Sequence, residues 1–237
     1  MLATPMLVRG VNVVPAASLP AAPDRKLSGR VASVAGMNDL RELHRRVMDV
    51  STSVVGQVRP DQLSLRTPCS EWDLRQLLAH MIGQNHGFAA VADGETSDRS
   101  VWADRPVVHD PAKEYAASAE RVVAAFAADD LYDREFWLPE VRGGVTLPAE
   151  TGVTFHFIDY VVHSWDVARS IDVPVSFDDD VLAAALPIAE AVPDGANRTA
   201  PGAAFQPGLA VSTPETFDRV LALLGRSSAW TANRSAP

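Results

Sequence analysis

Hydrophobic residues recur every three to four positions along much of the chain. The first such segment shows the pattern plainly, with apolar residues at Leu40, Leu43, Val47, Val50, Val54 and Val58. This spacing places the apolar side chains on one face of a helix. Together with helix-boundary signals it predicts helices at about 39–58, 71–92, 111–128, 151–171, 178–192 and 214–224. Four long helices joined by loops of varied length favour an all-α fold, a four-helix bundle with short additional C-terminal helices.

Turn-forming residues mark where these helices begin and end. Pro60 follows the first helix, and Gly225 follows the last. Ser70 is the expected N-cap of the second helix, with Asp73 three residues further on as in a capping box. Residues 129–150 contain two prolines and two adjacent glycines, so we expect a loop or a loose hairpin there.

The ends of the chain lack this periodicity. Residues 1–37 are rich in alanine, proline and valine, and they carry only one early charge, at Arg9, so they make a poor signal peptide. We expect residues 1–37 to be a disordered extension, with Met37 as a candidate functional start. The bundle is expected to span 38–226, and residues 227–237 to form a flexible tail.

Composition narrows the range of functions. The chain has 237 residues, is 47% hydrophobic and carries a net charge of −9, so it offers no basic surface for nucleic acid or anionic lipid. No apolar run approaches the roughly 18 residues of a membrane span. A single cysteine, Cys69, excludes an internal disulfide and permits a reducing compartment. We therefore expect a cytoplasmic protein, a monomer or homodimer, that acts on a small molecule.

The helix predicted at 151–171 carries the most informative pattern in the chain. His156, Asp159, His163 and Asp166 form one stripe on a helix that is otherwise apolar, because Asp159 and His163 lie only about 40° apart around the axis. A carboxylate and an imidazole one turn apart can both reach one metal ion. His80 is the best candidate for a third ligand, since it lies mid-helix on another mostly apolar face.

Simpler explanations compete with a metal site. A lone histidine on an apolar helix is usually a hydrogen-bonded core residue, and an Asp–His pair one turn apart can be an ordinary ion pair. Four ionisable groups in register argue against these explanations, because such groups are costly to bury without partners. Two imidazoles and one carboxylate leave coordination positions open, as in catalytic sites, and they suit Zn²⁺ as well as Ni²⁺ or Fe²⁺.

Three segments resemble a known family. They are residues 67–84 (TPCSEWDLRQLLAHMIGQ), 159–169 (DYVVHSWDVAR) and 218–226 (DRVLALLGR). They are similar to the actinobacterial metal-binding family related to the N-terminal domain of mycothiol-dependent maleylpyruvate isomerase, within the DinB/YfiT-like superfamily of four-helix bundles. The resemblance implies a DinB-like bundle that holds a divalent metal, most simply zinc, through His80, Asp159 and His163. It also implies a low-molecular-weight thiol, mycothiol, as cofactor.

The sequence departs from the family pattern at one expected ligand. The isomerase pattern has glutamate where this chain has Asp159, and the shorter side chain would bring the metal closer to its helix. His86 and His156 are additional to the minimal set, and either is a candidate fourth ligand or catalytic base. Asp166 is expected to orient a ligand imidazole or to pair with Arg169. Arg169 is in turn a candidate for binding the thiol cofactor or an anionic substrate.

The remaining reactive residues are expected to have no chemical role. His44 on the first helix and His109 in a loop are expected to be solvated. Cys69 lies in a capping loop with no evident basic partner, so we expect a small packing residue.

Together with the resemblance, which implies the thiol cofactor, these observations predict a metal-dependent enzyme that uses mycothiol in a thiol transfer or a cis–trans isomerisation. Two alternatives stay open at this point. One is a metal-dependent tailoring enzyme without a thiol cofactor, for example an Fe²⁺ enzyme with two histidines and one carboxylate. The other is a non-catalytic protein that binds metal or a small molecule on the same scaffold.

Overall fold

The computed structural model describes residues 39–69, 71–107, 110–141, 143–199, 203–210 and 212–232. The predictions for residues 1–37, Ser70 and His109 lie outside these ranges, as does part of the predicted tail. Within the described ranges the chain forms six α-helices and one two-stranded hairpin. In this part of the chain, no helix combines the length and apolar character needed to cross a bilayer.

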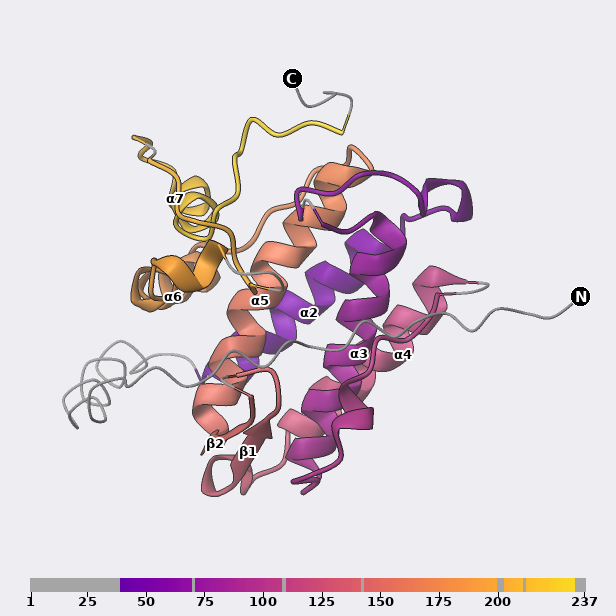
Figure 1. The fold of residues 1–237 in the computed structure, drawn as a ribbon, viewed down its shortest axis with the longest axis vertical. Helices are drawn as coiled ribbons and strands as arrows, with labels where there is room; N and C mark the ends of the chain where they lie inside the picture. The colour runs from indigo at the N-terminus through magenta and orange to yellow at the C-terminus, as the bar shows by residue number, and fades with distance from the viewer. Residues whose placement is uncertain are drawn as a thin grey trace, which may run out of the picture.

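Four long helices form the body of the molecule. They are α2 (Leu40–Val55), α3 (Leu74–Ala92), α4 (Pro111–Phe126) and α5 (Ala149–Ser170). α3 packs chiefly on α4, and α2 chiefly on α5 (Figure 1). Two shorter helices, α6 (Asp179–Ala191) and α7 (Thr216–Leu223), pack on each other beside α5. The predicted all-α bundle with additional C-terminal helices is confirmed.

α5 runs through the interior of the bundle. Its apolar residues Val153, Phe157, Val161 and Val167 are fully buried, and most of its other side chains are also shielded from water. Polar groups on such a helix must find partners within the protein, because burying an unpaired charge is costly. The ionisable side chains of His156, Asp159, His163 and Asp166 on α5 therefore require partners on the elements that pack against this helix.

The second helix begins later than the sequence pattern indicated. α3 starts at Leu74 with Asp73 as its N-cap, three residues after the predicted start at 71. The Asp73 side chain accepts a hydrogen bond from the Gln76 amide, and the Gln76 side chain accepts one from the Asp73 amide. This reciprocal box satisfies two amides at the helix start. Trp72 therefore lies in the segment immediately before the first turn of α3.

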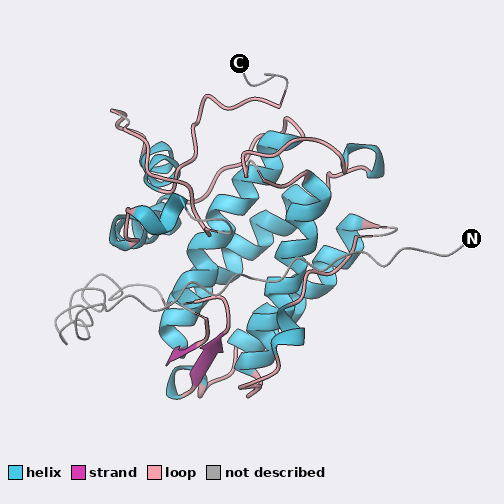
Figure 2. Cartoon of the chain, viewed as in Figure 1, coloured by secondary structure: helices cyan, strands magenta, loops and turns pink. Residues whose placement is uncertain are grey.

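The loop-or-hairpin segment is a hairpin (Figure 2). Strands β1 (Glu135–Leu138) and β2 (Val145–Pro148) pair antiparallel, with Phe136 opposite Leu147. The connection contains Gly143 and Gly144, both with positive φ, a conformation that glycine adopts at little cost. β2 leads directly into α5.

The last helix ends in a turn that reverses the chain toward the bundle. Gly225 has a φ of 76°, its amide donates to the Ala222 carbonyl at 3.0 Å, and the Arg226 amide donates to the Leu221 carbonyl at 2.8 Å. These two bonds define a Schellman motif, as the glycine after the helix predicted. The turn directs the Arg226 side chain into the interior.

Candidate metal centre

His80 on α3 comes together with Asp159 and His163 on α5. One ligand atom from each of the three side chains lies within 4.8 Å of the others. The His163 Nε2 is 3.4 Å from the Asp159 Oδ1, and the rings of His80 and His163 meet edge to face with centroids 6.0 Å apart. Ligand atoms about 2.0–2.2 Å from one Zn²⁺ stand roughly 3–4 Å from one another. The three predicted ligands therefore fit a divalent metal with small side-chain adjustments.

The three candidate ligands differ in how far they are exposed to solvent. The His163 side chain is 3% exposed, whereas His80 is 16% and Asp159 is 23% exposed. Two of the three candidate ligands are therefore within reach of solvent or a small molecule. Three protein ligands with accessible positions beside them are compatible with a catalytic metal site.

A buried carboxylate orients the imidazole of His163. The Asp166 Oδ2 lies 3.0 Å from the His163 Nδ1, and Asp166 is fully buried. Burial alone would raise the pKa of Asp166, but the Arg226 guanidinium and the hydrogen bonds to His163 and Arg226 lower it below its ordinary value. An ionised Asp166 can only accept the hydrogen bond from the His163 Nδ1–H, and Nε2 then lies on the side of Asp159, the usual arrangement behind a metal-bound histidine.

The arginine that pairs with Asp166 is Arg226 and not Arg169, the alternative partner that the sequence offered. Arg226 forms an ion pair with Asp166, with its Nε 3.0 Å from the Asp166 Oδ1. Arg169 instead donates to the carbonyls of Ser228 and Trp230, and its guanidinium lies over the Trp165 ring. Arg169 thus secures the chain after α7, and its role toward a cofactor stays a prediction.

His80 also faces a carboxylate. Its Nδ1 is 3.5 Å from the Asp104 Oδ1, and its ring lies 4.5 Å from that of Trp72. Burial lowers the pKa of His80, but the hydrogen bond to Asp104 and the charges of Asp159 and Glu140 outweigh it, so the pKa is raised. Both candidate imidazole ligands therefore have an acidic partner at Nδ1.

A glycine allows Asp104 to approach α3. A Cβ at Gly83 would lie 2.7 Å from the Ala103 carbonyl oxygen and 3.1 Å from the Asp104 Cα. Only a residue without a side chain permits this contact between a helix and a neighbouring backbone. The Arg105 amide fastens the same segment by donating to the Ala79 carbonyl at 3.0 Å.

Sequence reasoning missed two acidic residues beside the three ligands, Asp104 and Glu140. Glu140, in the β1–β2 connection, accepts a hydrogen bond of 3.0 Å from the Gln84 side chain, one turn beyond His80 on α3. Loss of solvation raises the pKa of Glu140, and the charges of Asp159 and Asp104 add to this effect against the opposing charge of His80. Both residues lie in segments without periodicity, so no local signal indicated them.

His156 and His86 lie outside this group of ligands. The His156 Nδ1 is 2.9 Å from the His44 Nε2 inside the bundle, and both side chains are 1% exposed. The expectation that His44 is solvated was therefore wrong, because α2 turns this histidine toward α5. Burial lowers the pKa of His44 to about 3 and that of His156 well below its ordinary value. His86 lies on another part of α3, 3.3 Å from Arg121.

Cys69 has a basic neighbour that the sequence did not indicate. The Arg226 Nη2 lies 3.5 Å from its Sγ. Burial nevertheless raises the pKa of the Cys69 thiol to about 12, with the opposing charge of Arg226 included. A thiol with this pKa is protonated at neutral pH, which agrees with a packing role.

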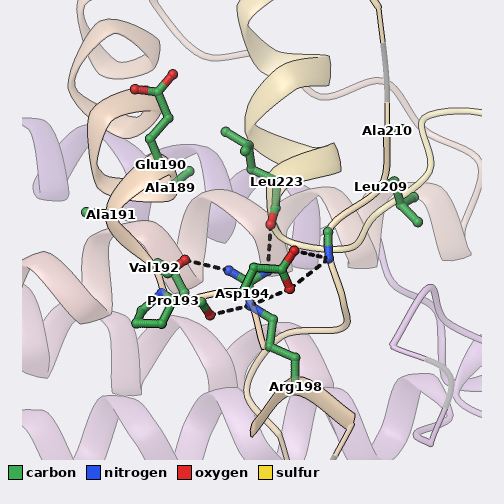
Figure 3. A pocket seen from close by; sticks show the side chains of 11 residues that line it. Ala189, Glu190, Ala191, Val192, Pro193, Asp194, Arg198, Leu209, Ala210 and Leu223 are labelled. Carbon is green, nitrogen blue, oxygen red and sulfur yellow. Dashed lines mark hydrogen bonds and ion pairs between the residues drawn. The ribbon is translucent and has the colours of Figure 1, made fainter. Parts of the chain in front are cut away.

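A separate cavity of about 450 Å³ lies between the end of α6 and the segments around α7 (Figure 3). Asp194, Arg198 and Leu223 are among the residues that line it, and none of the candidate ligands does. Arg198 is buried there, donating to the carbonyls of Val192, Pro193 and Leu223. Its hydrogen bonds to the main chain show that it holds the C-terminal loops together.

Comparison with known sequences gives one family match. The family described as "Mycothiol maleylpyruvate isomerase N-terminal domain" matches residues 40–168, which include His80, Asp159 and His163. Two uncharacterized proteins of Mycobacterium tuberculosis, from strains CDC 1551 / Oshkosh and ATCC 25618 / H37Rv, are each 28% identical to the chain over 156 residues. The matched region covers 63% of this chain and 76% of theirs.

Comparison with solved structures gives a mutant of the mycothiol-dependent maleylpyruvate isomerase. The TM-score is 0.48 and the sequence identity is 14%. The match covers 62% of this chain, which spans 66% of the length of that isomerase chain.

Proposed function

The chain belongs to the mycothiol maleylpyruvate isomerase N-terminal domain family, and from this premise we propose that it is a divalent-metal-dependent enzyme using mycothiol. The proposed reaction is a thiol transfer to, or an isomerisation of, a small electrophilic molecule. Such a thiol is kept reduced in the cytoplasm, which is the location that we propose for the protein.

One observation carries this proposal. Ligand atoms of His80, Asp159 and His163 lie within 4.8 Å of one another on a face that is partly open to solvent. Two neutral imidazoles and one carboxylate are a common ligand set for catalytic zinc, which we propose as the ion, with nickel and iron as alternatives. When bound, the ion would supply the positive charge that lowers the pKa of a coordinating thiol.

The protein's own residues would prepare this centre for the reaction. Asp166 accepts a hydrogen bond from His163, and Asp104 faces His80. Both imidazoles would therefore be oriented before a metal ion binds. Glu140 lies beside the stripe of α3 that carries His80, hydrogen-bonded to Gln84. Loss of solvation raises the pKa of Glu140, the direction that favours proton exchange by a carboxyl group. We therefore propose Glu140 as the group that takes up or returns a proton at the substrate.

A turnover assay with purified protein tests the proposed function. We expect about one zinc ion per chain, and consumption of an electrophile such as maleylpyruvate only when both metal and mycothiol are present. Omitting mycothiol distinguishes thiol chemistry from a metal-dependent reaction without thiol. A protein that binds the metal but shows no mycothiol-dependent turnover with a panel of electrophiles would contradict the thiol mechanism.

Asp159→Asn separates a metal ligand from a simple ion-pair partner. The substitution keeps an oxygen donor but removes a negative charge, so we expect clearly weaker zinc binding, with activity partly recovered at high zinc concentration. The stability of the metal-free protein should stay level or rise, because a carboxylate crowded by Glu140 is removed. Thermal melts with and without chelator measure both effects. An ion pair with His163 and no metal predicts the reverse, a destabilised variant and a wild-type melt indifferent to chelator.

A further inference from the structure

Arg226 is buried in the bundle although it lies beyond the last helix. Its side chain is 1% exposed, and its Nε and Nη2 lie 3.0 Å from the two carboxylate oxygens of Asp166. The Asp166 oxygen that receives Nη2 also lies 3.0 Å from the His163 Nδ1. Three buried side chains therefore form one continuous chain of hydrogen bonds that ends at a candidate metal ligand.

The backbone after α7 fixes where this guanidinium lies. The Schellman turn at Gly225 leaves no room for a side chain, since a Cβ there would lie 2.5 Å from the Gln206 carbonyl oxygen. The Leu209 amide donates to the Ala222 carbonyl at 2.8 Å and holds the neighbouring loop against the helix. The C-terminal segment thus presents Arg226 from a rigid turn.

The paired geometry explains why arginine serves here. A planar guanidinium donates one hydrogen bond to each oxygen of a carboxylate and so fixes its plane, whereas lysine offers one point charge. A carboxylate held in this way cannot rotate freely, and its Oδ2 stays in position to accept the hydrogen bond from the His163 Nδ1. Without its partner, Asp166 would be a buried charge with no compensation, and it would be free to turn away from His163.

We propose that Arg226 is a positioning residue of the metal centre, which acts through Asp166 to hold the His163 imidazole in its metal-binding orientation. The inference rests on the proposed metal site. The proposal makes the C-terminal segment part of the metal centre, although the candidate metal ligands themselves lie on α3 and α5. Coupling between sites is reciprocal, so bound metal should in turn hold the C-terminal segment more firmly on the bundle.

Arg226→Lys tests the proposal, with Arg198→Lys as a matched control. Both arginines are buried in the C-terminal part of the chain. Arg198, however, donates to main-chain carbonyls (Figure 3), and none of these belongs to a candidate ligand. For Arg226→Lys we expect about a tenfold loss of zinc affinity by chelator competition, the lower end of what outer partners of metal ligands contribute. We also expect an altered visible absorption spectrum of the Co²⁺-substituted protein. Arg198→Lys should lower stability and leave both readouts unchanged.

The outcomes separate this proposal from the proposed function. Wild-type protein that binds no zinc overturns both. Wild-type protein that binds zinc, with an Arg226→Lys variant of the same affinity and the same Co²⁺ spectrum, overturns the role of Arg226 alone. If Arg226→Lys does not fold, amide hydrogen exchange of the wild-type protein decides: zinc should slow exchange in α7 (Thr216–Leu223) more than in α4, and an equal effect on both helices overturns the proposal.

Discussion

Replacing His163 by alanine is expected to abolish metal binding. The substitution removes the most buried of the three candidate ligands and leaves one imidazole and one carboxylate. The loss of affinity should exceed the roughly 10–100-fold that an outer hydrogen-bond partner contributes. Metal analysis after dialysis measures the content directly. Melts with and without chelator give a second measure, because an ion that binds only the folded state raises its melting temperature.

His80→Ala should behave in the same way, and His86→Ala is the matched control on the same helix. His86 lies six residues beyond His80, is partly exposed and is not one of the three clustered ligands. The control variant should retain the metal content and the chelator-sensitive melt of the wild-type protein. Unchanged metal content in both His163→Ala and His80→Ala would remove the assignment, and the proposed enzyme function with it.

Mild acid is expected to destabilise the metal-free protein through His44 and His156. Burial lowers the pKa of both histidines in the folded state, to about 3 for His44, while in the unfolded chain each titrates near 6.5. Below pH 6.5 the unfolded state therefore binds more protons, and the free energy of unfolding falls as the pH falls. Each histidine contributes about 1.4 kcal/mol per pH unit over the range that lies well below 6.5 and above its folded pKa.

Urea unfolding at pH 7.5 and 5.0, with chelator present, measures this effect. The double variant His44→Phe/His156→Leu removes both titrating groups and should lose less stability between the two pH values than the wild-type protein. The comparison is needed because the raised pKa of His80 acts in the opposite direction in both proteins. An equal loss in the wild-type protein and the double variant would show that the buried pair does not resist protonation.

Local pattern was sufficient to predict the helices and to place Asp159 and His163 side by side on α5. Asp159 and His163 are one turn apart on a single helix, so their spacing alone places them on one side of it. His80 was predicted as the third ligand because it lies in the middle of a helix on a mostly apolar face. These inferences needed only the period of an α-helix, which does not depend on how the helices pack.

Features that depend on contacts between distant segments could not be predicted. His44 lies 112 residues from its partner His156, and Arg226 lies 60 residues from Asp166. Asp104 reaches His80 only because Gly83 lets a loop approach α3. The start of α3 was misplaced for a different reason, since Ser70 and Asp73 are both good N-caps and Gln76 selects the second.

The distance in sequence between Asp166 and Arg226 has a consequence for how the protein is made. Synthesis proceeds from the N-terminus at roughly 5–20 residues per second, so the 60 residues between them take several seconds to add. During that interval α2 to α5 have been synthesised, but the carboxylate of Asp166 on α5 does not yet have its countercharge. Burying Asp166 as an ion before Arg226 is available would be costly. We therefore expect this part of the core to close only after the end of α7 has been synthesised.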